Sequence, residues 1–378
     1  MDNSNNSGFV RMRAGAVLKT VDYYLVVPIM LLTIIGLYVL QKVLSKGYVA
    51  YPGNYYRQIA ATAAGVFVAL VISLLDMHML KAVGRVVYVV SLLLLILVPI
   101  DGYSLAGQWG ADAWLKLPVI GNFQPSELAK IGLILLASEV FEMMALKRVS
   151  IIKGFGILAA IYAPPLLLIL AQPDFGTAMV IMFTFVCIMF AWGVKYRYFL
   201  LAFSSLVVVI VPAMWYFYLE PYQKERILSL VFKGSDPKAE YNLIQSQHAI
   251  ASGGLIGNKT GIYTTVPVKE SDFIFAAVSE HLGFIGTTAV IILAFFFICR
   301  CLYVASKVSS KAASYCLTGL AGYFAFHYIE NLGMSVGLLP ITGIPLPFIS
   351  LGGTAQLINF LAFGLILNIS MSRGRVGG

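Results

Sequence analysis

Long apolar segments recur along the whole chain and constrain its fold more than any other feature. A helix rises about 1.5 Å per residue, so segments of this length can cross a hydrocarbon layer about 30 Å thick. The sequence therefore predicts an all-α integral membrane protein with ten transmembrane helices. We place them at residues 23–40, 59–75, 86–100, 126–143, 154–171, 175–192, 199–218, 282–299, 314–334 and 354–369.

Composition indicates one membrane domain over residues 1–378. The chain is 60% hydrophobic and 11% charged, with a mean hydropathy of +0.87. No polar stretch is longer than the loop expected at 219–281, so no separate soluble domain is predicted. The first apolar segment follows a polar tail at 1–22 and is too long for a signal-peptide core, so we expect it to be retained. The cysteines lie in or beside apolar segments, which predicts packing roles and no disulfide framework: Cys187, Cys299, Cys301 and Cys316.

The distribution of positive charge predicts the orientation. With a cytoplasmic N-terminus, fifteen Lys and Arg residues fall inside and ten outside, six of the ten in the 219–281 loop. Long loops count little in the positive-inside rule, so the comparison is fifteen against four. We therefore expect both termini in the cytoplasm and the 219–281 loop outside. The net charge of +9 then indicates orientation and affinity for anionic headgroups or a phosphate-bearing substrate, rather than binding to nucleic acid.

Near its end, the 219–281 loop carries two carboxylates, Glu270 and Asp272, at the mouth of a hydrophobic helix. A carboxylate at the mouth of a membrane cavity can act as a general base. Asp272 can also cap the helix expected to begin at Phe273, because Asp accepts hydrogen bonds from helix N-terminal amides. Both interpretations stay open. The glycines at 253–257 follow no predicted strand and indicate turns rather than a dinucleotide site.

Polar residues inside the apolar segments mark candidate cavity positions. Glu127 and Lys130 are three residues apart and share a helix face, and a charge within a span favours the protein interior or a wet cavity. A structural ion pair and a substrate contact both fit this pattern. Asp174, in the short turn at 172–176, is expected to cap the following helix. Trp114, in the connection at 101–123, also fits an interfacial aromatic belt.

The ninth apolar segment and the loop after it predict one wall of a pocket. His327, Glu330 and Asn331 are spaced to share a helix face, and ionisable groups at such positions usually line a functional cavity. Residues 337–353 hold three prolines and four glycines, so no continuous helix can form there. Irregular backbone at membrane depth lines cavities or is buried in protein. We expect a re-entrant loop that closes the outer side of a pocket.

That loop carries a specific resemblance. Residues 337–353 read GLLPITGIPLPFISLGG, which is similar to the signature of the shape, elongation, division and sporulation (SEDS) family, the family of RodA, FtsW and SpoVE. Further family motifs follow in family order: Trp114 with residues 124–127 and Lys130, then 172–174, 222–226 and 272–275. The resemblance covers nearly the whole chain. Where relatives place an acid earlier in the segment before the aspartate, this chain has Glu270.

The resemblance implies a ten-span peptidoglycan glycosyltransferase of cell elongation, shape or sporulation. Such enzymes polymerise lipid II at the outer face of the bacterial cytoplasmic membrane, with a class B penicillin-binding protein and other membrane proteins of the elongation or division complex. The family's essential aspartate corresponds to Asp272, which we expect to be the catalytic base of an inverting transfer. The resemblance implies no certain cofactor; a divalent cation, Mg or Mn, could balance the pyrophosphate charge. The residues expected to bind substrate are Trp114, Glu127, Lys130, Arg226, Lys269, Glu270, Pro345 and Ser350.

Two other classes of function remain open. A flippase for lipid-linked precursors would distribute polar groups through the full membrane depth, whereas Glu127, Glu330 and Asp272 are expected near the outer face. In a flippase, substitution of Asp272 would impair translocation rather than bond formation. A scaffold for a penicillin-binding protein would tolerate Asp272→Asn.

Overall fold

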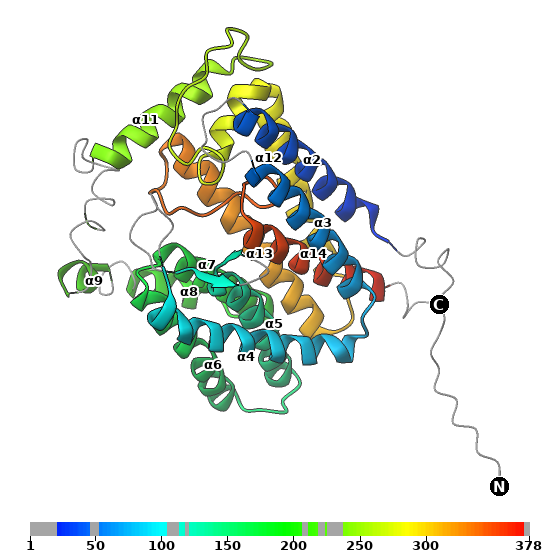
Figure 1. The fold of residues 1–378 in the computed structure, drawn as a ribbon. Helices are drawn as coiled ribbons and strands as arrows, with labels where there is room; N and C mark the ends of the chain where they lie inside the picture. Colours follow the sequence, from blue (N-terminus) through cyan, green and yellow to red (C-terminus); the bar gives the residue numbers. More distant parts are fainter. Residues whose placement is uncertain are drawn as a thin grey trace.

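The computed structural model describes residues 21–45, 53–103, 113–117, 121–205, 211–217, 224 and 237–373, and they form a nearly all-helical bundle (Figure 1). A short antiparallel hairpin, β1 (Leu115–Leu117) and β2 (Gly121–Phe123), is its one described sheet. The helices are α2 (Tyr23–Ser45), α3 (Gly53–Ser73), α4 (Met77–Asp101), α5 (Pro125–Ala145), α6 (Ile151–Ala171), α7 (Phe175–Trp192), α8 (Tyr196–Ser205), α9 (Val211–Phe217), α11 (Pro237–Ser252), α12 (Ile274–Ala305), α13 (Lys311–Val336) and α14 (Gly353–Arg373).

The helices confirm a multi-pass membrane architecture. Seven of those described are long and apolar enough to cross a bilayer, namely α2, α3, α4, α6, α7, α12 and α14. Helices α5 and α13 are 21 and 26 residues long and carry the polar residues singled out above. At the seventh predicted span the structure describes two helices, α8 and α9, with 206–210 between them outside the described residues. The count of ten spans therefore stays a prediction.

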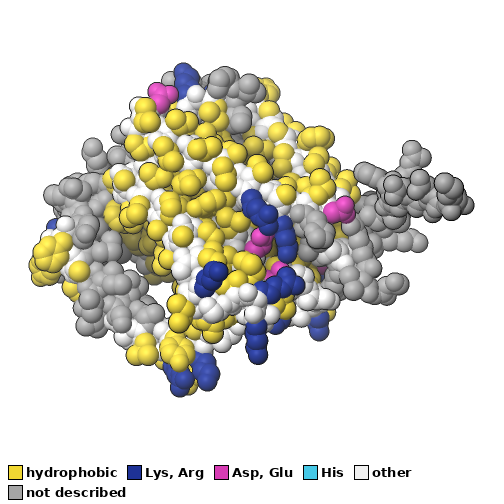
Figure 2. Space-filling model, turned by 90° about the horizontal axis from the view of Figure 1, so that it is seen from below, with side chains coloured by type: hydrophobic (Ala, Val, Ile, Leu, Met, Phe, Trp, Pro, Cys, Tyr) yellow, Lys and Arg dark blue, Asp and Glu magenta, His cyan; other side chains and the backbone are white. Residues whose placement is uncertain are grey.

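Helices α5 and α13 lie at the centre of the bundle. Helix α5 packs against α4, α6, α7 and α13, and α13 also packs against α7 and α12. Most side chains of both helices are buried. Around them, helices such as α2, α4 and α12 expose large apolar side chains, and Figure 2 shows a face covered largely by hydrophobic side chains, with Lys and Arg gathered over one part of it. This arrangement shields polar groups within protein and leaves apolar groups for lipid.

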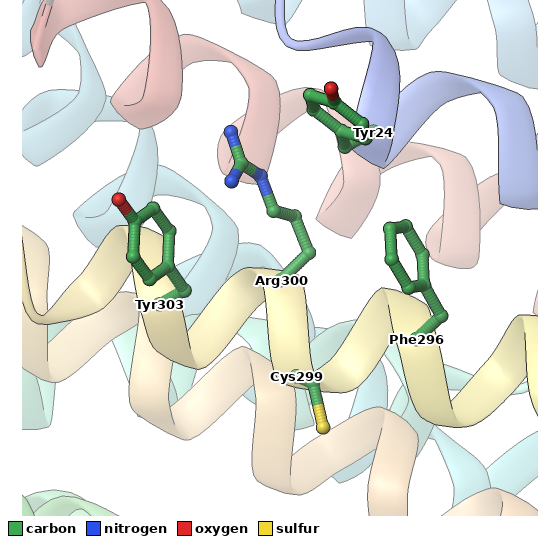
Figure 3. Close-up of a pocket in the computed structure, with 5 residues that line it drawn as sticks. All are labelled: Tyr24, Phe296, Cys299, Arg300 and Tyr303. Atoms are coloured by element: carbon green, nitrogen blue, oxygen red, sulfur yellow. The ribbon is translucent and has the colours of Figure 1, made fainter.

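The two ends of the bundle differ in construction. At one end, which we name the Arg300 end, α2 begins and α12 finishes. There Arg300 donates to both carboxylate oxygens of Asp22 (2.7–3.2 Å), and its guanidinium lies 4.9 Å from the ring centres of Tyr24 and Tyr303. Tyr24, Arg300 and Tyr303, with Phe296 and Cys299, line a pocket of about 290 Å³ (Figure 3). At the other end, the Asp272 end, α5, α7 and α12 begin and α13 finishes. It contains the irregular segment 337–352, as the re-entrant-loop prediction requires.

Helix α12 is longer than the predicted span and is interrupted near its first third. It begins at Ile274 and has a left-handed residue, Gly283 (φ 67°), a conformation that favours glycine. The amide of Phe284 donates to the carbonyl of Gly254 (2.8 Å), and that of Ile285 donates to Leu255 (3.1 Å). The glycine-rich turns after α11 therefore complete the hydrogen bonding of α12 at its break.

Candidate functional site

The turn before α12 positions Asp272. The carbonyl of Val268 accepts from the amides of Ser271 (3.2 Å), Asp272 (3.1 Å) and Phe273 (3.3 Å), and Val268 itself has φ 54°. Positive φ is unfavourable for a β-branched residue, so surrounding contacts must hold this turn in place. The N-cap position of α12 is Phe273, with no side-chain cap bond. Among the described residues, the Asp272 carboxylate accepts only from Ser271 Oγ (3.0 Å), so it does not cap the helix.

Ser350 and its neighbours fasten the re-entrant loop to this turn. Ser350 Oγ donates to the carbonyl of Ser271 (2.6 Å) and accepts from the amide of Leu346 (2.8 Å). The amide of Leu351 donates to the carbonyl of Glu270 (2.8 Å). The predicted substrate-binding residues Ser350 and Glu270 thus lie in one hydrogen-bond network with the turn that carries Asp272. This network fixes the direction in which the Asp272 side chain leaves the backbone.

Asn331 of α13 adds a second fastening. Its Nδ2 donates to the carbonyls of Asp272 (2.7 Å) and Ile344 (2.8 Å), so one amide bridges the turn and the re-entrant loop. Two carbonyl acceptors can face only an NH₂ group, which determines the orientation of this amide. Its Oδ1 is buried and has no partner among the described residues.

The carboxylate of Asp272 lies in a secluded and electrostatically unfavourable place. The residue is 6% exposed, and a Cβ added to Gly343 would lie 3.4 Å from Oδ2. Burial raises the pKa of Asp272 to about 6, opposed by the Ser271 hydroxyl and assisted by the negative charge of Glu270. Because this pKa lies just below neutral pH, the group is ionised at pH 7 but accepts a proton readily.

A second charged group lies between α5 and α13. Lys130 Nζ donates to Glu127 Oε1 (2.8 Å) and contacts His327 Nε2 (3.2 Å), and it lies 5.4 Å from the ring centre of Tyr323. An ammonium can only donate, so His327 Nε2 accepts, and its Nδ1–H donates to the carbonyl of Tyr323 (2.8 Å). Both members of the Glu127–Lys130 pair are at least 95% buried. The prediction that this pair faces the protein interior is confirmed.

The remaining predicted residues have distinct surroundings. Lys269 is buried, donates to the carbonyl of Thr264 (2.9 Å) and forms an ion pair with Glu280. Pro345 is half-buried in the re-entrant loop. Trp114 pairs with Tyr103 through backbone hydrogen bonds.

Arg226 lies outside the described residues. Substrate contacts by Lys269, Pro345, Trp114 and Arg226 stay predictions.

Asp174 caps α7 by accepting from the amide of Thr177 (3.0 Å), which confirms its predicted role. All four cysteines are free.

Sequence reasoning missed Gln58 on α3. Its Nε2 donates to the carbonyl of Ser350 (3.1 Å), and its Oε1 accepts from the amide of Gly352 (3.0 Å). Gln58 is 1% exposed and so ties α3 to the end of the re-entrant loop. A glutamine at the edge of an apolar segment is the signal that could have identified it, because a buried amide needs partners.

The described residues group no three His, Cys, Asp or Glu side chains in the manner of a protein-held metal site. A cation such as Mg²⁺ can also be held by one or two carboxylates together with substrate phosphates. Asp272 and Glu270 are the acids of the turn that could contribute in that way.

Comparison with known proteins gives a consistent result. The FtsW/RodA/SpoVE family, described as "Cell cycle protein", matches residues 20–375. "Peptidoglycan glycosyltransferase MrdB" of Escherichia coli strain K12 is 31% identical over 328 residues, 85% of this chain and 86% of that protein. "Stage V sporulation protein E" of Bacillus subtilis strain 168 is 30% identical, covering 83% and 86%. A solved structure described as "Structural coordination of polymerization and crosslinking by a peptidoglycan synthase complex" has a TM-score of 0.79 at 29% identity, covering 93% of this chain and 98% of that one.

Proposed function

We infer that this chain, which belongs to the FtsW/RodA/SpoVE family, is a peptidoglycan glycosyltransferase that polymerises lipid II for wall growth in elongation or sporulation. The observation that carries the mechanism is the Asp272 carboxylate, buried at the end of the bundle with a single hydrogen-bond donor among the described residues. A carboxylate with spare acceptor capacity and a pKa of about 6 suits a general base at neutral pH.

The proposed step is an inverting substitution at the donor sugar. The 4-hydroxyl oxygen of the acceptor GlcNAc attacks C1 of the donor MurNAc, and Asp272 takes the hydroxyl proton. The bond from C1 to the pyrophosphate oxygen breaks, and undecaprenyl pyrophosphate leaves with the electron pair. The α-linked donor becomes a β-linked strand. Because pyrophosphate is already a good leaving group, the step needs no general acid.

Positioning supplies most of the remaining rate enhancement in this mechanism. A general base contributes roughly 10²–10⁴-fold, and orientation of two bound sugars contributes more. Here Ser350, Asn331 and Gln58 hold the Asp272 turn and the re-entrant loop in one arrangement. Rigid support of this kind holds the Asp272 carboxylate within reach of the acceptor hydroxyl proton. Substrate binding energy is then not needed to order the carboxylate.

We also propose how the chain is oriented in the membrane and which class of protein is its partner. The Asp272 end faces outward and both termini are cytoplasmic, supported by the excess of Lys and Arg at the other end. A class B penicillin-binding protein would crosslink the strands that this chain makes, supported by the structural similarity to a chain of a peptidoglycan synthase complex. The elongation or division assembly would supply the other membrane partners.

The test is polymerisation of labelled lipid II by purified protein, with and without its class B penicillin-binding protein. Wild-type protein is expected to make glycan strands, and Asp272→Ala, verified as folded, is expected to make none. The rate should rise with an apparent pKa near 6, because only the ionised carboxylate accepts a proton.

An active Asp272→Ala would move the base to another acid, with Glu270 and Glu127 the first to test. No product from wild type, even with the partner, would contradict polymerisation and favour translocation of lipid-linked precursors or a scaffold role.

A further inference from the structure

Buried polar groups without partners gather at the first turn of α5 and the connection between α6 and α7. Gln172 is 5% exposed, and neither its amide nitrogen nor its amide oxygen has a partner among the described residues. Ser126 Oγ and Glu127 Oε2 are in the same condition, with residue exposures of 1% and 4%. Folding normally satisfies such groups because their desolvation is unfavourable. We name these three residues the Gln172 cluster.

One hydrogen bond links the two segments that carry these residues. Gln124, directly before α5, donates from Nε2 to Asp174 Oδ2 (3.2 Å). Ser126 and Glu127 belong to the first turn of α5, and Gln172 is the C-cap residue of α6, two positions before Asp174. The hydrogen bond therefore joins the two segments that carry the cluster.

The cluster also adjoins Asp272 through the re-entrant loop. A Cβ added to Gly176 would lie 3.3 Å from Thr342 Cβ and 3.3 Å from a side-chain carbon of Ile344. On the same tripeptide, a Cβ added to Gly343 would lie 3.4 Å from Asp272 Oδ2. Residues 342–344 thus lie between the α6–α7 connection and the proposed base. Helix α7, which follows the α6–α7 connection, and the proposed base thus border the same short stretch of the re-entrant loop.

We propose that the Gln172 cluster binds the uncharged sugar part of the lipid-linked substrate, through its hydroxyl and N-acetyl groups. The proposal rests on the function inferred above and specifies which part of the substrate this position recognises. An amide offers both a donor and an acceptor, as hydroxyl and N-acetyl groups require.

The charges of the cluster favour sugar over pyrophosphate. Glu127 Oε2 can only accept when ionised, and a second carboxylate, that of Asp174, contacts Gln124 directly before α5. Lys130, the nearby cation, already contacts Glu127 Oε1 and His327. Anionic oxygens would meet repulsion here, whereas O–H and N–H groups would find acceptors.

The experiment measures substrate binding separately from turnover. In the Asp272→Asn background, the Kd for lipid II and the Kd for undecaprenyl pyrophosphate, which lacks the sugars, are compared with and without Gln172→Leu. We expect the Kd for lipid II to rise by about tenfold and that for undecaprenyl pyrophosphate to stay unchanged. The Tm should stay the same or rise, because leucine removes an unpaired buried amide without breaking a bond.

Asn368→Leu is the matched control. Asn368 is equally buried, but its Nδ2 donates to the carbonyls of Ile72, Ser73 and Leu75 at the other end of the bundle. This variant should lower the Tm and leave both Kd values unchanged. Ser126→Ala is a smaller probe that preserves folding if Gln172→Leu does not, with an expected rise of about threefold in the Kd for lipid II.

Two results would overturn the proposal. The first is an unchanged Kd for lipid II in Gln172→Leu, or in Ser126→Ala if Gln172→Leu does not fold. The cluster would then be a structural, hydrated group that binds no sugar. Equal weakening of both ligands would assign it to the pyrophosphate. Either result leaves the proposed function intact if wild-type protein polymerises lipid II, so the two inferences fail separately.

Discussion

The Arg300 end holds partly buried charge and the Asp272 end holds buried charge, and their hydrogen bonding differs. Arg300 donates to both oxygens of Asp22, and Ser370 Oγ donates to Asp22 as well (3.3 Å). The guanidinium is also flanked by two tyrosine rings, as Figure 3 shows. At the Asp272 end, the Asp272 carboxylate has one donor, and Glu127 Oε2 has none among the described residues. At the Arg300 end the charged groups are hydrogen-bonded to one another, whereas at the Asp272 end carboxylate oxygens keep unused acceptor capacity.

This difference distinguishes structural from functional polar groups. A satisfied buried cluster stabilises and orients the helices that carry it. An unsatisfied one lowers stability and persists in proteins mainly where it binds something or performs chemistry. The predictions below test this interpretation, from the largest expected effect on stability to the smallest.

Lys130→Met should cause the largest loss of stability. It leaves Glu127 buried without its counter-ion, and breaking a buried pair in this way costs about 3–5 kcal/mol of stability. Polymerisation by the folded fraction should also fall, by about tenfold or more, because the variant disturbs α5 beside the site. Thermal unfolding in detergent and the lipid II assay measure the two effects.

Arg300→Met is the matched change at the other end. It should cost about 1–3 kcal/mol and leave the rate per folded molecule unchanged, because its partners are structural. Full activity in folded Lys130→Met would show that the Glu127–Lys130 pair, like the Arg300–Asp22 pair, has a structural role only.

Asn331→Ala should reduce both turnover and stability. It removes the donor to the carbonyls of Asp272 and Ile344, which costs about 1–3 kcal/mol for each buried acceptor left unpaired. A base displaced by about 1 Å can lose about 10²-fold in rate, so kcat should fall by roughly 10- to 100-fold with little change in KM. Asn368→Ala, at the Arg300 end, should lose stability without losing kcat. A normal kcat in Asn331→Ala would show that the turn keeps its geometry without this clamp.

Asp272→Asn should increase stability in a pH-dependent way while abolishing polymerisation. The pKa of Asp272 is raised by burial to about 6, so ionising the carboxyl destabilises the folded state. The wild type is therefore penalised above pH 6 and relieved as pH falls toward the unfolded-state value near 4. At pH 8 the variant should be more stable by about 1–3 kcal/mol, and this difference should shrink below pH 6 and nearly vanish at about pH 4. Equal Tm differences across this range would contradict the burial argument.

Arg85→Ala should have the smallest effect. Its ion pair with Glu139 (3.4 Å) is largely exposed on the arginine side. Exposed pairs contribute about 0–1 kcal/mol and are screened by salt. The expected change in Tm is therefore slight, with no change in polymerisation, and a loss comparable to that of Lys130→Met would undermine the distinction between the two ends.

Much of the architecture and the key residues followed from the sequence. Apolar segments long enough to cross a bilayer predict helices, because lipid offers backbone groups no hydrogen-bond partners and a helix satisfies them internally. Intramembrane Glu127 and Lys130 could be assigned to the interior on the same ground. The glycines and prolines of 337–353 excluded a helix there, and the position of Asp174 predicted its cap.

Other features could not be read from the sequence because they depend on long-range contacts. The break in α12 at Gly283 is completed by carbonyls of Gly254 and Leu255, which local periodicity does not reveal. Helix α11 and the β1–β2 hairpin likewise lie in connections for which the sequence analysis predicted no helix or strand.

By itself, the sequence determined a membrane protein, the residues that must avoid lipid, and the acid expected to do the chemistry. Only the tertiary structure decided that Asp272 does not cap α12 and that Asn331 and Ser350 hold it. It alone also decided which buried polar atoms of the described residues are left unpaired. Transfer between water and lipid is a property of each residue, whereas the satisfaction of a hydrogen bond is a property of two groups that the fold must bring together.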